Sequence, residues 1–197
     1  MMGGSMDTRK IIQTLAYMAW KQEGHVMDNM KAYKLMWLAD RYHVRQYGRT
    51  ITGDSYFALP HGIIPSDAKH LLENKRTKLE ISREYRDTYI VVLPGHKYLA
   101  VAQPDLKEFS DSDQDALDKV IEIFGDKSPK ELSELSHKFP EWKFYEEMLN
   151  DKETKNSYKV NIDHFFENCE DDQSGLFVES EELLSLTRQL YHERYSA

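Results

Sequence analysis

Asp40, His43 and Tyr47 are the residues whose types and spacing could do chemistry. They lie three and four positions apart in a helical-looking run, so their side chains would be neighbours on one face. An imidazole beside a carboxylate can act as a general base, and Asp54 in the following loop could supply that carboxylate instead of Asp40. A hydrolase that uses His43 with Asp40 or Asp54 is therefore one hypothesis.

The same residues also have a structural interpretation. The helical wheel puts them on the apolar side, where an unpaired carboxylate is strongly unfavourable or shifts its pKa. We expect Asp40 to pair with His43 or to accept hydrogen bonds from backbone donors in the following loop, so His43→Ala should destabilise the fold by depriving Asp40 of its partner. We favour this interpretation over catalysis, because Ser66, His43 and Asp40 could form a triad only through tertiary contacts.

Other catalytic and cofactor signatures are missing from the sequence. The eight histidines include no HExxH, no HxH and no pair at i, i+4, and Cys169 has only His164 nearby as a second ligand. GxSxG, GxGxxG and P-loop motifs are also missing. The sequence therefore predicts no catalytic residue, no metal and no cofactor.

Composition restricts the class of protein and its partners. A chain of 197 residues is long enough for one hydrophobic core, and we expect a single domain preceded by a leader or expression scar at residues 1–5. The net charge of -8 disfavours nucleic acid and makes a DNA-binding regulator the weaker alternative, whereas it would attract a basic protein. With no membrane-length apolar run and no signal peptide, the expected location is the cytoplasm.

Hydrophobic periodicity and capping residues predict most of the chain to be helical. The predicted helices cover residues 7–23, 28–47, 67–73, 112–124, a segment opened by the capping box SPKE at 128–131, and 180–195. Asp28 and Gly48 would begin and end the second of these, and Pro65 at N1 or Ser66 as N-cap would begin the third. A stripe of basic residues on the second helix is interpreted as a solvated face: Lys31, Lys34, Arg41 and Arg45.

Two short runs rich in β-branched and aromatic residues are predicted to be strands. Residues 88–93 and 97–102 flank Pro94 and Gly95, which suit a type II turn, and residues 78–82 could add a third strand. The expected fold class is α+β, predominantly helical, with a small antiparallel β-hairpin or three-stranded sheet. Residues 150–157 are predicted to be a polar linker. Phe139 and Trp142 are predicted to close a hydrophobic core.

Two stretches resemble the SocA-like, or Panacea, antitoxin family: KLMWLADRYHVRQYGRTITGDSYFALPHGIIPSD at 34–67 and ELSELSHKFPEW at 131–142. One departure is Ile63, because the family usually has proline after the glycine at this corner. The matching positions are Lys34, Leu35, Asp40, His43, Tyr47, Gly48, Thr52, Gly53, Asp54, Tyr56, Gly62, Pro65, Ser66, His137 and Trp142.

This resemblance implies a compact helical domain with a small sheet, which we place at residues 6–149. Residues 150–197 would be a C-terminal extension whose closing helix packs on the same domain. The resemblance also implies a non-enzymatic antitoxin of a bacterial or phage toxin–antitoxin pair, with a cognate toxin as its partner. It would neutralise the toxin by direct binding or as an adaptor that delivers it to an ATP-dependent protease.

Overall fold

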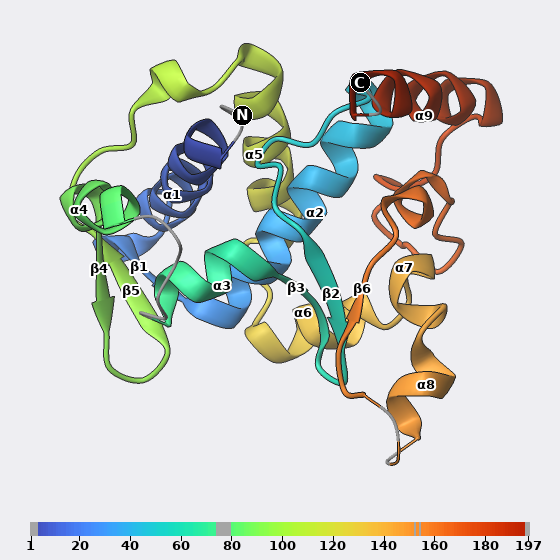
Figure 1. Ribbon diagram of the computed structural model, residues 1–197, viewed down its shortest axis with the longest axis horizontal. Coiled ribbons are helices and arrows are strands. Elements are labelled where there is room, and N and C mark those ends of the chain that lie inside the picture. Colours follow the sequence, from blue (N-terminus) through green and yellow to red (C-terminus); the bar gives the residue numbers. More distant parts are fainter. Residues whose placement is uncertain (1–3, 74–79, 152, 154, 196–197) are drawn as a thin grey trace.

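Helix α2 (Asn29–Tyr47) is the central element of a predominantly helical α+β fold (Figure 1). The computed structural model describes residues 4–73, 80–151, 153 and 155–195. Asp28 caps α2 by accepting a hydrogen bond from the backbone N–H of Lys31 at 3.1 Å. Gly48 ends the helix in the left-handed conformation, with φ 64°, which glycine adopts without strain. Both predicted boundaries of this helix are confirmed.

The other helices surround α2. They are α1 (Gly4–Trp20), α3 (Ser66–Leu72), α4 (Glu80–Tyr89), α5 (Asp111–Phe124), α6 (Pro129–Ser136), α7 (Pro140–Lys143), α8 (Glu146–Asn150) and α9 (Glu181–Tyr195), with 3-10 turns η1 (Glu23–His25), η2 (Leu106–Glu108) and η3 (Ile162–Phe166). The predicted capping box at Ser128 and Glu131 is present, and Ser110 forms a second one with Asp113. No helix in the described part of the chain is long and apolar enough to cross a bilayer.

One three-stranded sheet contains the predicted hairpin. Its strands are β1 (Val26–Asp28), β5 (Lys97–Ala100) and β4 (Ile90–Leu93), antiparallel and in that order. Gly95 in the turn has φ 78°, as a type II turn requires, and His96 also has a positive φ of 58°. The predicted third strand is wrong at residues 80–82, which begin helix α4, while residues 78 and 79 lie outside the described residues. Ile81, Tyr85 and Tyr89 recur every four residues, a helical period that extends beyond the short alternating run.

A second three-stranded sheet was not expected. It consists of β3 (Gly62–Pro65), β2 (Tyr56–Leu59) and β6 (Tyr158–Lys159), again antiparallel and in that order. The β2–β3 hairpin occupies the connector after α2, and β6 comes from the chain just after the predicted polar linker. The two sheets lie on either side of α2 in Figure 1.

The basic stripe on α2 is buried, so its interpretation as a solvated face is wrong. Lys34, Arg41 and Arg45 are fully buried, whereas Lys31 is partly exposed. The Nε of Arg41 donates to Glu141 at 2.8 Å, and its guanidinium lies over two phenylalanine rings. Burial is tolerated because these cations find hydrogen-bond acceptors inside the fold.

The C-terminal segment packs on α2 through Arg45. Its guanidinium donates to the carbonyls of Phe165 (2.9 Å), Glu167 (2.8 Å) and Phe177 (3.1 Å). It also donates to the side chain of Asn168 at 2.6 Å. One buried arginine on α2 therefore holds a stretch of chain more than a hundred residues away in the sequence.

Candidate functional site

Asp40 anchors the loop that follows α2. One oxygen of its buried carboxylate accepts hydrogen bonds from the backbone N–H groups of Ile51 (2.7 Å) and Thr52 (3.0 Å). The other accepts from the hydroxyls of Thr52 and Tyr56, the latter at 2.6 Å. Burial raises the pKa of Asp40, and these hydrogen bonds oppose that rise. Of the two alternatives expected for Asp40, hydrogen bonds from backbone donors of the following loop are confirmed, and pairing with His43 is wrong.

His43 is held by different groups. Its Nδ1 lies 2.8 Å from the carbonyl oxygen of Arg49, which can only accept, so Nδ1 carries a proton. Its Nε2 lies 3.0 Å from the Ser112 hydroxyl and 3.2 Å from a carboxylate oxygen of Asp113. Burial lowers the pKa of His43 to about 4, so the ring is neutral at pH 7. The ring of Tyr47 lies 4.6 Å away as expected, but Tyr47 is exposed rather than inside the apolar side.

A hydrolase mechanism would need an accessible general base, and His43 does not provide one. His43 is fully buried with both ring nitrogens engaged. Ser66 begins helix α3, and among the described residues no hydrogen bond joins Ser66, His43 and Asp40 into a triad. A substrate would therefore meet neither a free imidazole nitrogen nor a serine activated by it.

Asp54 caps helix α3 from the preceding loop. Its two carboxylate oxygens accept from the backbone N–H groups of Asp67 and Ala68, both at 2.9 Å. Pro65 occupies the N-cap position and Ser66 is the first helical residue, so both expected roles at this boundary are wrong. Proline has no side-chain acceptor, which explains why a remote carboxylate performs the capping. Burial raises the pKa of Asp54 to about 7.

We expect the buried His43 imidazole to make the folded protein less stable in acid. Between pH 6.5 and about 4 the unfolded chain binds a proton at this residue and the folded chain does not, so the free energy of unfolding falls as the pH falls. The full contribution is about 3 kcal/mol. His43→Gln should therefore lose less stability than the wild type on acidification, which urea unfolding at several pH values would measure.

The comparison between the two proteins is needed because Asp54 acts in the opposite direction. Its raised pKa means that the folded chain binds that proton first, which stabilises the fold as the pH falls through about 7. Subtracting the variant from the wild type cancels this contribution. Equal slopes in the two proteins would contradict a buried neutral His43. The groups that lose a contact in His43→Ala are the Arg49 carbonyl, the Ser112 hydroxyl and the Asp113 carboxylate, not Asp40.

Glycines form two corners of the loop. Gly53 has φ 70°, and its N–H donates to the hydroxyl of Thr50 at 3.2 Å. At Gly48 a Cβ would lie 2.7 Å from the Cβ of Leu190 and 2.9 Å from the carbonyl oxygen of Thr187. Helix α9 therefore packs directly against the backbone at the end of α2, and any side chain at Gly48 would push it away.

Lys34 and Gly62 meet at the turn of the β2–β3 hairpin. The buried ammonium of Lys34 donates to the carbonyls of His61 (2.8 Å) and Ile63 (2.9 Å), and burial lowers its pKa to about 7. Gly62 has φ 94°, and a Cβ there would overlap the hydroxyl of Ser136 and lie 2.5 Å from Lys34 Nζ. Lys34 can bind this turn only because residue 62 has no side chain.

His137 and Trp142 contact the same turn. The indole N–H of Trp142 donates to the carbonyl oxygen of Leu59 at 2.8 Å, and its ring lies 4.0 Å from that of His137. Burial, with the nearby ammonium of Lys34, lowers the pKa of His137. Trp142 and Phe139 are buried, which confirms that this element closes a core. Positions 34, 62, 137 and 142 thus fix one end of the hairpin, while positions 40, 52, 54 and 56 fix the other.

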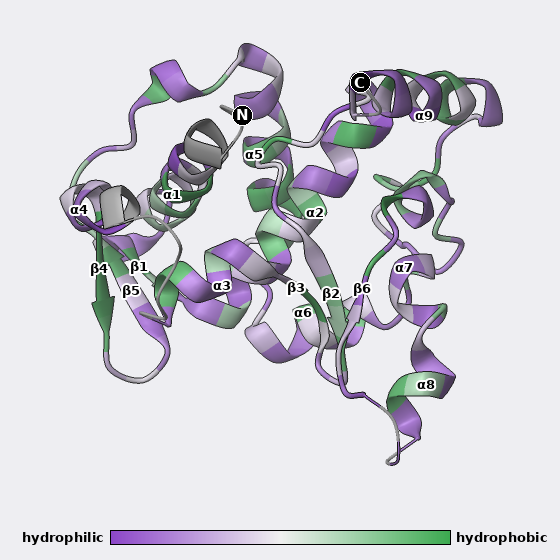
Figure 2. Cartoon of the chain, in the orientation of Figure 1, coloured by the Kyte–Doolittle hydropathy of each residue, from purple (hydrophilic) through white to green (hydrophobic). Residues whose placement is uncertain are grey.

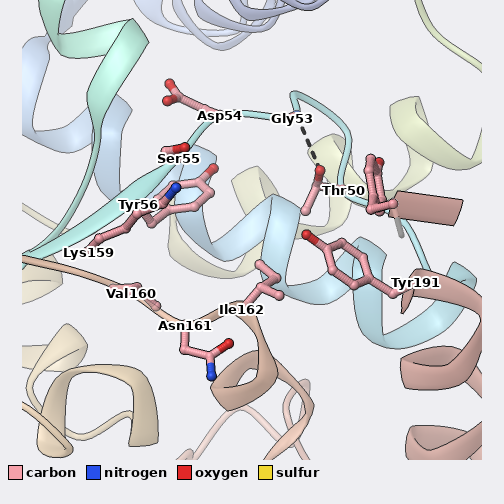
Figure 3. Close-up of a pocket in the computed structure, with 11 residues that line it drawn as sticks. Thr50, Gly53, Asp54, Ser55, Tyr56, Lys159, Val160, Asn161, Ile162 and Tyr191 are labelled. Atoms are coloured by element: carbon pink, nitrogen blue, oxygen red, sulfur yellow. Dashed lines mark hydrogen bonds between the residues drawn. The ribbon is translucent and has the colours of Figure 1, made fainter. Parts of the chain in front are cut away.

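A cavity of about 490 Å³ opens beside the start of β2 (Figure 3). Its lining comes from Thr50, residues 53–56, residues 159–162, and Tyr191 and Tyr195 of α9. Asp54 directs its carboxylate away from Tyr191, toward the helix that it caps. The cavity offers hydroxyl, amide and aromatic groups to a ligand, together with the amine of Lys159.

The two candidate metal ligands of the tail are engaged separately. His164 Nδ1 lies 2.6 Å from a carboxylate oxygen of Glu167, and Cys169 is buried with its thiol 3.5 Å from the carbonyl of Lys138. Within the described ranges, no three His, Cys, Asp or Glu side chains are grouped so that they could hold a metal ion.

Sequence reasoning missed Glu141 and the part that the tail plays in the cavity. Glu141 is fully buried and accepts from Trp37 at 2.9 Å as well as from Arg41. A usable signal was present, because four basic residues and a single acid in an otherwise apolar helix need anionic or carbonyl partners elsewhere. No comparable signal marked Asn161 or Tyr191 as cavity residues.

Comparison with known proteins gives one match. A family model described as "Antitoxin SocA-like, Panacea domain" matches residues 33–143, which is more than half of the chain. All the positions named above from Lys34 to Trp142 fall within this span. No curated protein and no solved structure matches the chain.

Proposed function

The chain belongs to the SocA-like, Panacea domain antitoxin family, and from this premise we propose that it neutralises a cognate toxin by binding it directly. Family membership indicates an antitoxin role in general and suggests a protein that is not an enzyme. The partner in this proposal is a toxin protein encoded beside the chain, in a bacterial or phage toxin–antitoxin pair. Binding takes place in the cytoplasm, without nucleic acid or cofactor.

The engagement of the motif side chains supports a binding role. Asp40, Asp54 and Lys34 all direct their charged groups at the protein's own backbone, and His43 has no free nitrogen. Groups used in this way build a rigid scaffold, and a rigid scaffold favours binding because little conformational freedom is lost on association. The observation that carries the proposal is the family match over these positions.

Co-expression with the product of the adjacent gene tests the proposal. We expect that product to stop growth alone, growth to recover when this chain is supplied, and the two proteins to copurify. A frameshifted copy of the chain is the matched control for expression load. A harmless neighbour, or one that remains toxic and unbound beside this protein, contradicts the proposal.

The same experiment separates sequestration from delivery to an ATP-dependent protease. If the chain only sequesters the toxin, the toxin's level stays constant while growth recovers. If the chain is an adaptor, the level falls and is restored in a host lacking the protease. We propose sequestration as the primary mode, because the scaffold described above serves binding directly.

A further inference from the structure

Helix α9 exposes apolar side chains where it meets the end of α2. Leu186 and Leu190, one turn apart, are 54% and 44% exposed, and Tyr47 at the end of α2 is 47% exposed. The close approach of Leu190 to Gly48 places it beside Tyr47. Val178, just before α9, is also exposed. We call Tyr47, Val178, Leu186 and Leu190 the α2–α9 face.

Folding does not account for this face. Leu184 and Thr187 of α9 are buried, and the carbonyl oxygen of Thr187 faces Gly48 at the end of α2. Leu190 lies at the edge of the packed side, with its Cβ against Gly48 and much of its side chain still exposed, and Leu186 is one turn before it. Hydrophobic and polar residues are mixed along the helix (Figure 2). Single exposed apolar residues are ordinary, but several grouped at one junction are typical of an interaction site.

Carboxylates border the α2–α9 face on two helices. They include Glu182 and Glu193 on α9 and Asp115 and Glu122 on α5, and the same two helices also carry the exposed cations Arg188, Arg194 and Lys119. Within the described part of the chain none of these four carboxylates is in an ion pair. Lys119, which lies three and four residues from the two α5 acids, interacts electrostatically with Tyr47 and Glu179, so this side of α5 adjoins the face.

We propose that the α2–α9 face binds a basic amphipathic helix of the toxin, an inference that rests on the proposed function. The apolar side of that helix covers Leu186, Leu190 and Tyr47, and its lysines and arginines meet the bordering carboxylates. Recognition of this kind uses apolar anchors at helical spacing, and opposite charges at the rim accelerate association. The net charge of -8 acts in the same direction.

Charge-introducing variants of the exposed leucines test this inference. Leu186→Glu and Leu190→Glu should each weaken the affinity for the adjacent gene product by about 30-fold or more. The matched control is Leu106→Glu in η2, where the leucine is 42% exposed and distant in sequence from both helices; its affinity should stay within about twofold. Glu182→Lys with Glu193→Lys should slow association and reduce its salt dependence.

Each alternative occupant has its own result. If the leucine variants bind normally while Asn161→Ala and Tyr195→Ala do not, the toxin docks at the cavity, so the inference fails and the proposed function stands. If the chain alone is a dimer that Leu186→Glu converts to a monomer, the face belongs to a second copy and the inference also fails. If the wild-type chain neither binds nor neutralises, the proposed function fails and this inference with it. Unchanged melting temperatures confirm that the variants are folded.

Discussion

Asp40→Ala is expected to lower the free energy of unfolding by about 4 kcal/mol. The substitution removes the acceptor for the backbone N–H groups of Ile51 and Thr52 and for the hydroxyls of Thr52 and Tyr56. All of these donors are buried, so water cannot replace the carboxylate without entering the core. Urea unfolding monitored by circular dichroism measures the loss.

Asp40→Asn is the matched control. Its amide oxygen can still accept from the two backbone N–H groups, and the amide nitrogen can donate to the two hydroxyls once they rotate. We expect a loss of about 1–2 kcal/mol, clearly smaller than for alanine. If alanine and asparagine were equally destabilising, the hydrogen bonds of Asp40 would not be what anchors the loop.

Gly62→Ala is expected to be almost as damaging, at about 3–5 kcal/mol. The backbone at φ 94° lies in a region that residues with a side chain rarely adopt. The new methyl would also overlap the Ser136 hydroxyl and crowd the ammonium of Lys34, which binds the carbonyls on both sides of the glycine. Thermal unfolding should show a correspondingly lower transition.

A double-mutant cycle separates the two causes. Removing the hydroxyl with Ser136→Ala should recover part of the loss, because the overlap with oxygen disappears while the strained φ and the contact with Lys34 remain. Gly95→Ala in the other hairpin is the control for φ alone, since a Cβ there would have no atom within 4 Å. Equal effects at the two glycines would show that the packing around Gly62 is unimportant.

The boundaries of α2 and the start of α6 were predictable because they are encoded locally, whereas α4, α7 and α8 were not predicted. Asp28, Gly48 and the SPKE capping box act within one turn of the residues they cap, so their effect can be recognised in a short window of sequence. Strand β6 could not be found in this way. It has two residues, and it is a strand only because β2 lies beside it.

The inward direction of Asp40 and His43 was predictable, but their partners were not. The helical wheel correctly turned Asp40 inward, because orientation depends on local geometry. It could not show that Asp54 caps α3, or that Arg45 donates hydrogen bonds to carbonyls of the tail, since those partners are set by tertiary packing. The same wheel wrongly predicted that Lys34 is exposed to solvent, because a charged residue is usually assigned to the solvent side of a helix. In the fold, the carbonyls of a hairpin turn accept the hydrogen bonds of its ammonium.

The contact at Gly48 extends beyond this one chain. Gly48 lies in the span that matches the family model. Thr187 and Leu190 lie outside that span, and they can approach Gly48 closely because it has no side chain. The left-handed conformation at a helix end can also be adopted by asparagine. An asparagine side chain at position 48 would, however, clash with helix α9. In relatives with any other residue at this position, the C-terminal segment must therefore pack in a different place. The resulting covariation between position 48 and the residues of the C-terminal helix can be detected in sequences alone.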